Sequence, residues 1–152
     1  MKAIVVGAGV IWLSCARALG DRGAQVVVLD GNTGSQESSW AAGGILGPGS
    51  EHATDSPLFR LSLDALAAWP EALARLRTET RVAIAYDATG TLLVALTPAD
   101  RAELEARARF LSGAGLPATL LDGAAARARE PRLAPTVLAA LHLAEARLDN
   151  RA

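Results

Sequence analysis

The chain has 152 residues and a formal net charge of −1, and 51% of its residues are hydrophobic while 20% are charged. A chain of this length and composition can bury a core, so disorder is not expected. The charge balance gives no basic footprint, so neither nucleic acid nor a membrane surface is expected as a partner. The single cysteine excludes an internal disulfide, and no apolar run is long enough to span a bilayer. We therefore expect a cytoplasmic protein.

The first thirty residues follow the order strand, glycine turn, helix, strand and acidic residue. Residues 2–6 form a short apolar run that is typical of a buried parallel strand. A glycine turn over residues 7–9 follows, and then a helical pattern over residues 10–22. Residues 26–29 form a second apolar run that ends at Asp30. This order is typical of the βαβ unit that binds dinucleotides.

The glycine turn and the acidic residue have the properties that a dinucleotide site needs. Gly7 permits a tight turn, and Gly9 lets the backbone approach a pyrophosphate. The start of the next helix offers free N–H groups and a positive dipole end to the phosphates. Asp30 stands where an acid can accept hydrogen bonds from ribose hydroxyls. The same pattern also fits a tight strand-to-helix turn in an unrelated α/β domain, in which Asp30 only ends a strand.

Trp12 stands where the third glycine of the G-x-G-x-x-G pattern normally lies. That glycine lets the helix pack close to the strand, so an indole should push the helix away or turn into the ligand groove. Overpacking of this kind typically lowers the free energy of unfolding by ~1–3 kcal/mol. We expect either a dinucleotide site that has adapted to the indole or one that has lost affinity for the dinucleotide.

The pattern changes near residue 50, because helices and separate strands follow without a second glycine turn. Ser56 and Pro57 indicate a helix start. Strands are predicted near residues 91–96, 119–121 and 137–143. We expect a nucleotide-binding part over residues 1–50, followed over residues 51–152 by a helical segment and a partial second domain.

Residues 38–48 form a second distinctive run, Ser-Ser-Trp-Ala-Ala-Gly-Gly-Ile-Leu-Gly-Pro. Together with the glycine turn and residues 28–30, this run resembles the FAD-dependent glycine oxidase and D-amino-acid oxidase family, some members of which serve thiamine biosynthesis. Shorter matches lie at residues 90–92, 116–117, 130–135 and 148–151. The resemblance covers essentially the whole chain, but only the N-terminal portion of the family's longer chain.

The resemblance implies a fold and a chemistry. The expected fold is α/β, with a FAD-type Rossmann βαβ unit and the beginning of an α+β substrate domain. The implied activity is the oxidative deamination of a small amino acid or amine. A hydride passes to the flavin, and reoxidation of the flavin by oxygen gives hydrogen peroxide.

The resemblance also assigns FAD contacts by position. Contacts with the pyrophosphate and the adenosine ribose would come from Val10, Ile11, Asp30 and Gly31. Two hydroxyl residues that would follow the cofactor are Ser38 and Ser39. The isoalloxazine ring would be lined by Gly43, Gly44 and Ile45. No catalytic residue is assigned, because the family's substrate-binding arginine and tyrosine lie beyond residue 152, and no metal site is expected.

Two other functions remain open at this point. The chain can be a non-catalytic, truncated or degenerate paralogue, or a nucleotide-binding module that a partner chain completes. We expect the isolated chain to be inactive as an oxidase. Strands near residues 91–96 and 137–143 should lack neighbours, which would favour self-association.

Overall fold

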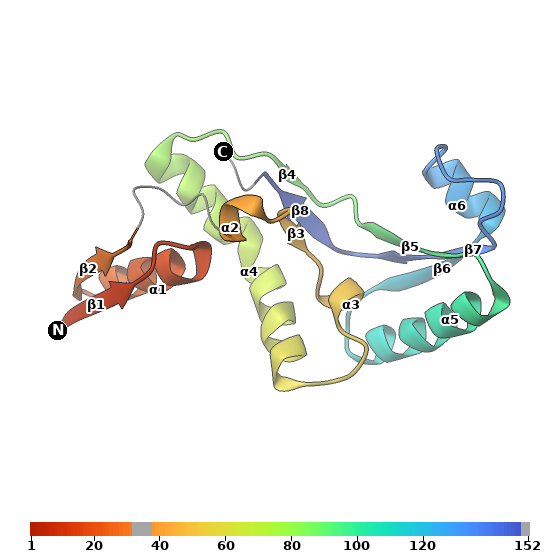
Figure 1. The fold of residues 1–152 in the computed structure, drawn as a ribbon, viewed down its shortest axis with the longest axis horizontal. Coiled ribbons are helices and arrows are strands. Elements are labelled where there is room, and N and C mark those ends of the chain that lie inside the picture. The colour runs from red at the N-terminus through yellow and green to blue at the C-terminus, as the bar shows by residue number, and fades with distance from the viewer. Residues whose placement is uncertain (32–37, 150–152) are drawn as a thin grey trace. The chain divides into compact units, whose positions relative to one another are not determined.

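The computed structural model describes residues 1–31 and 38–149, which form two compact units (Figure 1). The first unit runs from Met1 to Gly43, and the second begins at Gly44. The glycine turn lies in the first unit, whereas the elements that follow residue 50 lie in the second. The assignment of residues 1–50 to cofactor binding and of residues 51–152 to a substrate domain stays a prediction.

The first unit contains the predicted strand–helix–strand arrangement. Its elements are β1 (Lys2–Val6), α1 (Val10–Asp21), β2 (Gln25–Leu29) and the short α2 (Ser38–Ala41). The two strands pair in parallel, in a register that runs from Lys2 opposite Gln25 to Val6 opposite Leu29. Helix α1 connects them and contacts both. The α/β class and the βαβ unit predicted from the sequence are therefore confirmed.

Helix α1 buries less of its apolar surface than its sequence pattern predicts. Ile11, Cys15 and Leu19 form one apolar stripe, which favours a core-facing side. In the structure Ile11 is 70% exposed, Cys15 is exposed, and α1 has no fully buried residue. The prediction that Cys15 lies in a core is wrong. A two-stranded sheet offers a helix little surface to pack against, and Val5 is the one buried hydrophobic side chain in the described part of this unit.

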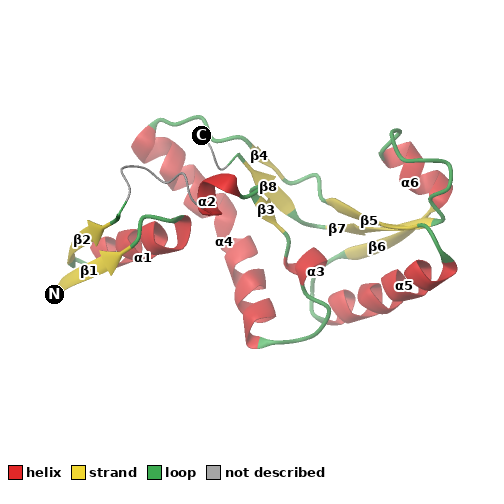
Figure 2. Ribbon diagram, in the orientation of Figure 1, coloured by secondary structure: helices red, strands yellow, loops and turns green. Residues whose placement is uncertain are grey.

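The second unit holds two small antiparallel sheets (Figure 2). In one sheet β8 (Ala146–Leu148) lies between β3 (Ile45–Leu46) and β4 (Tyr86–Asp87). In the other, β7 (Ala139–Leu143) lies between β5 (Thr91–Ala95) and β6 (Ala118–Asp122). The three predicted strands are present. The expectation that the strand near residues 137–143 lacks neighbours is wrong, because β7 is paired along both edges.

Four helices complete the second unit: α3 (Pro48–Glu51), α4 (Pro57–Thr80), α5 (Pro98–Gly113) and α6 (Gly123–Arg129). Ser56 caps α4 as predicted, since its hydroxyl accepts a hydrogen bond from the Phe59 N–H at 3.1 Å. Helix α4 continues through Pro70 and is not divided there. Among the described residues, none of the helices combines the length and the apolar character needed to cross a bilayer.

The hydrophobic core lies in the second unit. It joins α4 and α5 to the central strand β7, and its fully buried members include Phe59, Leu111, Leu141 and Leu143. The rings of Phe59 and Phe110 lie 5.1 Å apart between their centroids. All of β7 except the half-buried His142 is buried, which fits its central place in the sheet.

One face of the β1–β2 sheet is open among the described residues. Side chains alternate along a strand, so the register places four apolar residues on the same face. They are Ile4, Val6, Val27 and Leu29, with 69%, 72%, 55% and 51% of their surface exposed. An apolar face of this kind favours contact with another protein surface.

We predict that the 152-residue chain self-associates through this open face. Ile4→Lys places a charge in the face and should shift the light-scattering mass towards the monomer. Leu58→Lys is a matched control, because Leu58 is similarly exposed, at 62%, but lies on α4. A monomeric wild-type chain at every concentration tested would contradict the prediction.

Candidate cofactor-binding site

The predicted glycine turn joins β1 to α1 and depends on glycine geometry. Gly7 has a φ of +108°, a conformation that residues with a side chain rarely adopt. Its N–H donates a hydrogen bond to the Leu29 carbonyl at 2.7 Å, which holds the turn against the end of β2. Gly9 is the N-cap of α1, and its carbonyl accepts the first helical hydrogen bond from Leu13 at 3.0 Å.

Asp30 reaches back to the glycine turn. Its Oδ2 atom accepts a hydrogen bond from the Ala8 N–H at 2.5 Å. The parallel pairing of β1 with β2 makes this contact possible, because it brings the ends of the two strands together. Asp30 is exposed, so its carboxylate is also accessible to a ligand at the turn. Asp30 therefore does more than end a strand, because its side chain also stabilises the turn.

Ser39 reaches the same turn from the other predicted motif. Its Oγ atom accepts a hydrogen bond from the Val10 N–H, the first residue of α1, at 3.1 Å. A Cβ atom built on Gly9 would lie 3.2 Å from this oxygen, so the absence of a side chain at Gly9 keeps the turn open. The first turn of α1 has no acidic residue, which suits a helix start that faces an anion.

The remaining candidate residues of the first unit present exposed surface. Val10 and Ile11 begin α1, Gly31 follows β2, Ser38 begins the short α2, and Gly43 follows it. All five are exposed, so a ligand can approach their backbone atoms. The structure thus joins Asp30 and Ser39 to the turn by hydrogen bonds, while these five lie in or next to α1, β2 and α2.

Gly44 and Ile45 belong to the second unit. Gly44 has a φ of +69°, and its carbonyl accepts a hydrogen bond from the Leu148 N–H at 2.9 Å. Ile45 lies in β3 opposite Arg147 and is 60% exposed. The backbone of these two residues is therefore fixed by β8, while the Ile45 side chain is free to contact a ligand.

Trp12 turns towards the glycine turn. Its Cδ1 atom lies 2.8 Å from the position that a Cβ atom on Gly7 would take, and the side chain is 52% exposed. Helix α1 still contacts both strands, so the indole has not displaced it. Of the two outcomes expected for Trp12, the structure supports the one in which the indole covers the turn.

The residues at the turn fit the adenine dinucleotide portion of FAD, with one exception. Gly9 has no side chain, and the N–H groups of Ala8 and Val10 donate to the Asp30 and Ser39 side chains, which a phosphate oxygen can replace. The Asp30 carboxylate can then accept from a ribose. The exception is Trp12, whose indole lies over Gly7.

Two hollows in the second unit were not found from the sequence. A hollow of about 180 Å³ lies beside β3, and its lining includes Ile45, Leu46, Ser62 and Trp69. Trp69, which the sequence pattern places in a core, is only half-buried there. No signal along the sequence indicates this hollow, because its walls come from segments that are brought together by folding.

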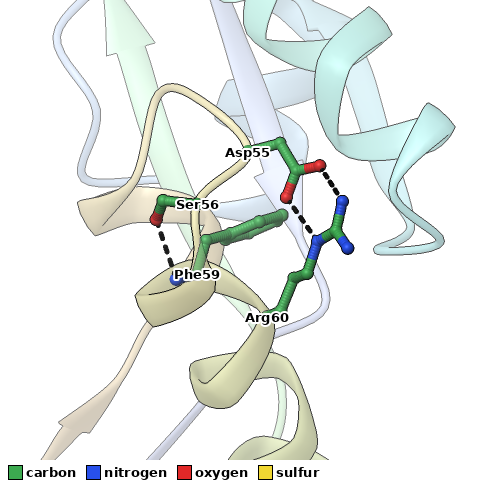
Figure 3. A network of polar contacts seen from close by, with 4 residues as sticks. All are labelled: Asp55, Ser56, Phe59 and Arg60. Atoms are coloured by element: carbon green, nitrogen blue, oxygen red, sulfur yellow. Dashed lines mark hydrogen bonds and ion pairs between the residues drawn. The ribbon is translucent and has the colours of Figure 1, made fainter.

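The larger hollow, of about 400 Å³, lies near the start of α4 beside Asp55, Phe59, Arg60 and Phe110. Figure 3 shows that Asp55 and Arg60 face one another, with two contacts between carboxylate and guanidinium. The hydrogen bond from Arg60 lowers the pKa of Asp55. Because the two charges satisfy each other, this pair is a poor candidate for acid–base chemistry.

Known FAD-dependent enzymes resemble this chain over almost its whole length. Residues 2–152 match the family model described as FAD dependent oxidoreductase. The chain is 34% identical over 135 residues to a glycine oxidase from Geobacillus kaustophilus, covering 89% of this chain and 36% of that protein. A second match is a glycine oxidase from Pseudomonas aeruginosa, 45% identical over 47 residues, which cover 31% of this chain and 13% of that protein.

Solved structures show the same fold. The crystal structure of glycine oxidase from Geobacillus kaustophilus superposes with a TM-score of 0.92 at 31% identity, covering 99% of this chain and 40% of that one. An L-α-glycerophosphate oxidase from Mycoplasma pneumoniae, solved with FAD bound, has a TM-score of 0.85 at 19% identity and covers 98% of this chain and 39% of that one, a likeness of fold alone.

The chain belongs to the FAD-dependent oxidoreductase family, whose cofactor is FAD. Within that family it is similar to glycine oxidases. It spans 36% of the length of the Geobacillus enzyme's sequence and corresponds to the N-terminal portion.

We predict that Trp12→Gly strengthens FAD binding by about tenfold, because it removes an indole that overpacks the turn. Trp12→Ala should give a similar gain, which separates loss of the indole from added backbone freedom. Trp12→Phe keeps an aromatic ring at the turn and should bind like the wild type. Flavin fluorescence in an FAD titration measures all three, and equal binding by the Gly and wild-type chains would show that the indole is already accommodated.

Proposed function

We propose that this chain is the FAD-binding part of an amino-acid or amine oxidoreductase of the glycine oxidase type. The observation that carries the proposal is the convergence of Asp30 and Ser39 on the glycine turn. These two residues come from the two separate motifs that resemble the family. Their meeting at one glycine turn supports a single site to which both motifs contribute.

The chain's own groups would hold the cofactor as follows. The N–H groups of Ala8 and Val10 would face the pyrophosphate, and Asp30 would accept hydrogen bonds from the ribose. Because a hydroxyl both donates and accepts, Ser39, which accepts from Val10 in this structure, can instead donate to a phosphate oxygen that replaces it at the Val10 N–H. Gly43, Gly44 and Ile45 would lie against the isoalloxazine ring. Bound FAD supplies the hydride acceptor, and the protein orients it.

The substrate class follows from the glycine oxidase likeness. Small amino acids or amines are the proposed substrates, with hydrogen peroxide as a product and a role in thiamine biosynthesis in the cytoplasm. The relatives are more than twice as long as this chain, so the full-length protein is the one to assay. Peroxide formation from glycine, sarcosine or D-alanine measures the activity, and its absence with all three would reject this substrate class.

A non-catalytic paralogue is the second candidate, and one observation favours it. The Trp12 indole covers the turn at which the cofactor's pyrophosphate would lie. A chain that folds normally but fails to bind FAD would support this candidate. The third candidate, a module completed by a partner chain, is supported by the open apolar face of Ile4, Val6, Val27 and Leu29. Co-purification of one defined polypeptide with the chain would favour it.

A pair of glycine substitutions on α1 and its cap tests the proposed site. Gly9→Val places a branched side chain against Ser39 and in the path of the pyrophosphate, so FAD binding should be lost. Gly20→Val is the control, because a Cβ atom on Gly20 meets nothing within 4 Å. The measurement is equilibrium dialysis of FAD against each folded variant. If both variants bind FAD equally well, the cofactor does not lie at this turn.

We predict that the chain prefers FAD, ADP and NAD to NADP. A carboxylate at Asp30 would stand beside the 2′-phosphate of NADP and repel it. Asp30→Asn keeps the side chain's shape and removes its charge, so it should reduce the discrimination against NADP. Competition with a fluorescent ADP analogue measures each nucleotide. Displacement by NADP as strong as that by FAD in the wild type would place Asp30 away from the ribose.

A further inference from the structure

Glu145 is the one charged residue that is fully buried among the described residues, with 1% of its surface exposed. It lies in the short connection between β7 and β8. Its Oε1 atom accepts two hydrogen bonds, from the Gly49 N–H at 2.6 Å and from the Ser50 N–H at 2.8 Å. Its Oε2 atom is buried and has no hydrogen-bond partner in the described structure. A carboxylate in this state needs its two donors, because burial of a charge without partners is costly.

Arg107 binds the same two residues from their carbonyl side. Its Nη1 atom donates to the carbonyl oxygens of Gly49 and Ser50, at 3.0 Å each. Its side chain is 16% exposed. The backbone of Gly49 and Ser50 therefore lies between a carboxylate that accepts from its N–H groups and a guanidinium that donates to its carbonyls. Both contacts involve a charged partner, and such hydrogen bonds are stronger than neutral ones.

Two glycines make room for this arrangement. A Cβ atom on Gly47 would lie 3.2 Å from Glu145 Oε2, and one on Gly49 would lie 3.2 Å from Oε1 and 2.6 Å from the Leu116 side chain. Gly47 and Gly49 are both buried. The close approach of backbone and carboxylate thus depends on residues without side chains.

The same connection also fixes the strand that precedes Gly47. Ala146, which follows Glu145, lies opposite Leu46 in the β3–β8 pair, and Arg147 lies opposite Ile45. The Leu148 N–H donates to the Gly44 carbonyl at 2.9 Å. Residues 44–50 are therefore held by β8 at one end and by the Glu145 carboxylate at the other.

We propose that Glu145 and Arg107 are positioning residues for the part of the cofactor site formed by Gly44 and Ile45. The inference rests on the proposed function, since it takes these two residues to face the isoalloxazine ring. Neither charged side chain contacts the cofactor. They act through the backbone of Gly49 and Ser50, which they lock from opposite sides, and through β3.

Glu145→Ala should weaken FAD binding by about tenfold, because it frees two buried N–H groups and loosens residues 44–50. It should leave ADP binding unchanged, because ADP lacks the flavin ring and uses the glycine turn. Glu145→Gln keeps an oxygen that can accept from both N–H groups, so it should restore FAD affinity and the absorption spectrum of the bound flavin. Loss of FAD affinity in the Ala variant with rescue in the Gln variant supports positioning by hydrogen bonding.

Arg107→Met provides a second variant in case Glu145→Ala does not fold. It removes the two bonds to the carbonyls and should weaken FAD binding several-fold without affecting ADP. Arg101→Met is the matched control on the same helix, because Arg101 is half-exposed and pairs with Glu105. Urea unfolding of each chain shows whether a variant is folded before its affinity is compared.

Backbone hydrogen exchange tests the proposal without FAD. Residues 44–50 should exchange faster in Glu145→Ala and Arg107→Met than in the wild type, while residues 1–31 should be unchanged. Failure of the wild type to bind FAD would overturn the proposed function, and the exchange result would still decide whether Glu145 holds the segment. Unchanged exchange over residues 44–50, or FAD affinity and spectrum in folded Glu145→Ala equal to those of the wild type, would overturn the positioning role.

Discussion

The parallel pairing of β1 with β2 is the constraint on which the candidate site depends. Val6 lies opposite Leu29, so the residues that follow each strand, Gly7 and Asp30, come to the same edge of the sheet. The hydrogen bond from Gly7 to the Leu29 carbonyl then fixes the turn, and the Asp30 carboxylate is left within reach of Ala8. A slip of one residue in this register would move Asp30 away from the turn and reverse the face that each side chain occupies.

Local patterns allowed the elements of the first unit to be predicted, but not their burial. The glycines, the apolar runs and Asp30 each have a local physical meaning, and the structure places them as expected. Whether Cys15 is exposed depends on how many strands α1 packs against. The apolar stripe along the helix does not reveal that number. Similarly, the central place of β7 depends on which strands pair with it. These properties arise from contacts between distant parts of the chain.

The site residues divide along the same line. Gly7, Gly9 and Asp30 can be predicted as candidates from the sequence because their spacing is set by one strand–helix–strand unit. The contact between Ser39 and Val10 follows from a motif 29 residues away, and only its likeness to a family suggested a shared site. Glu145 was missed, since a single glutamate near the end of an apolar segment gives no sequence signal. The role proposed for it depends on hydrogen bonds from Ser50 and Gly49, which are 95 and 96 positions away along the chain.

The contacts at the glycine turn have a consequence for how a ligand exchanges there. The N–H groups of Ala8 and Val10 are bonded to Asp30 and Ser39, so these two donors are satisfied within the chain itself. A phosphate or ribose bound at the proposed site would replace these two internal bonds with equivalent ones, and the net gain from each would be small. Affinity at this end must then come chiefly from charge and from the rest of the ligand. When a ligand leaves, the N–H groups of Ala8 and Val10 can bond again to Asp30 and Ser39. Release and rebinding would therefore require no unfolding of the βαβ unit.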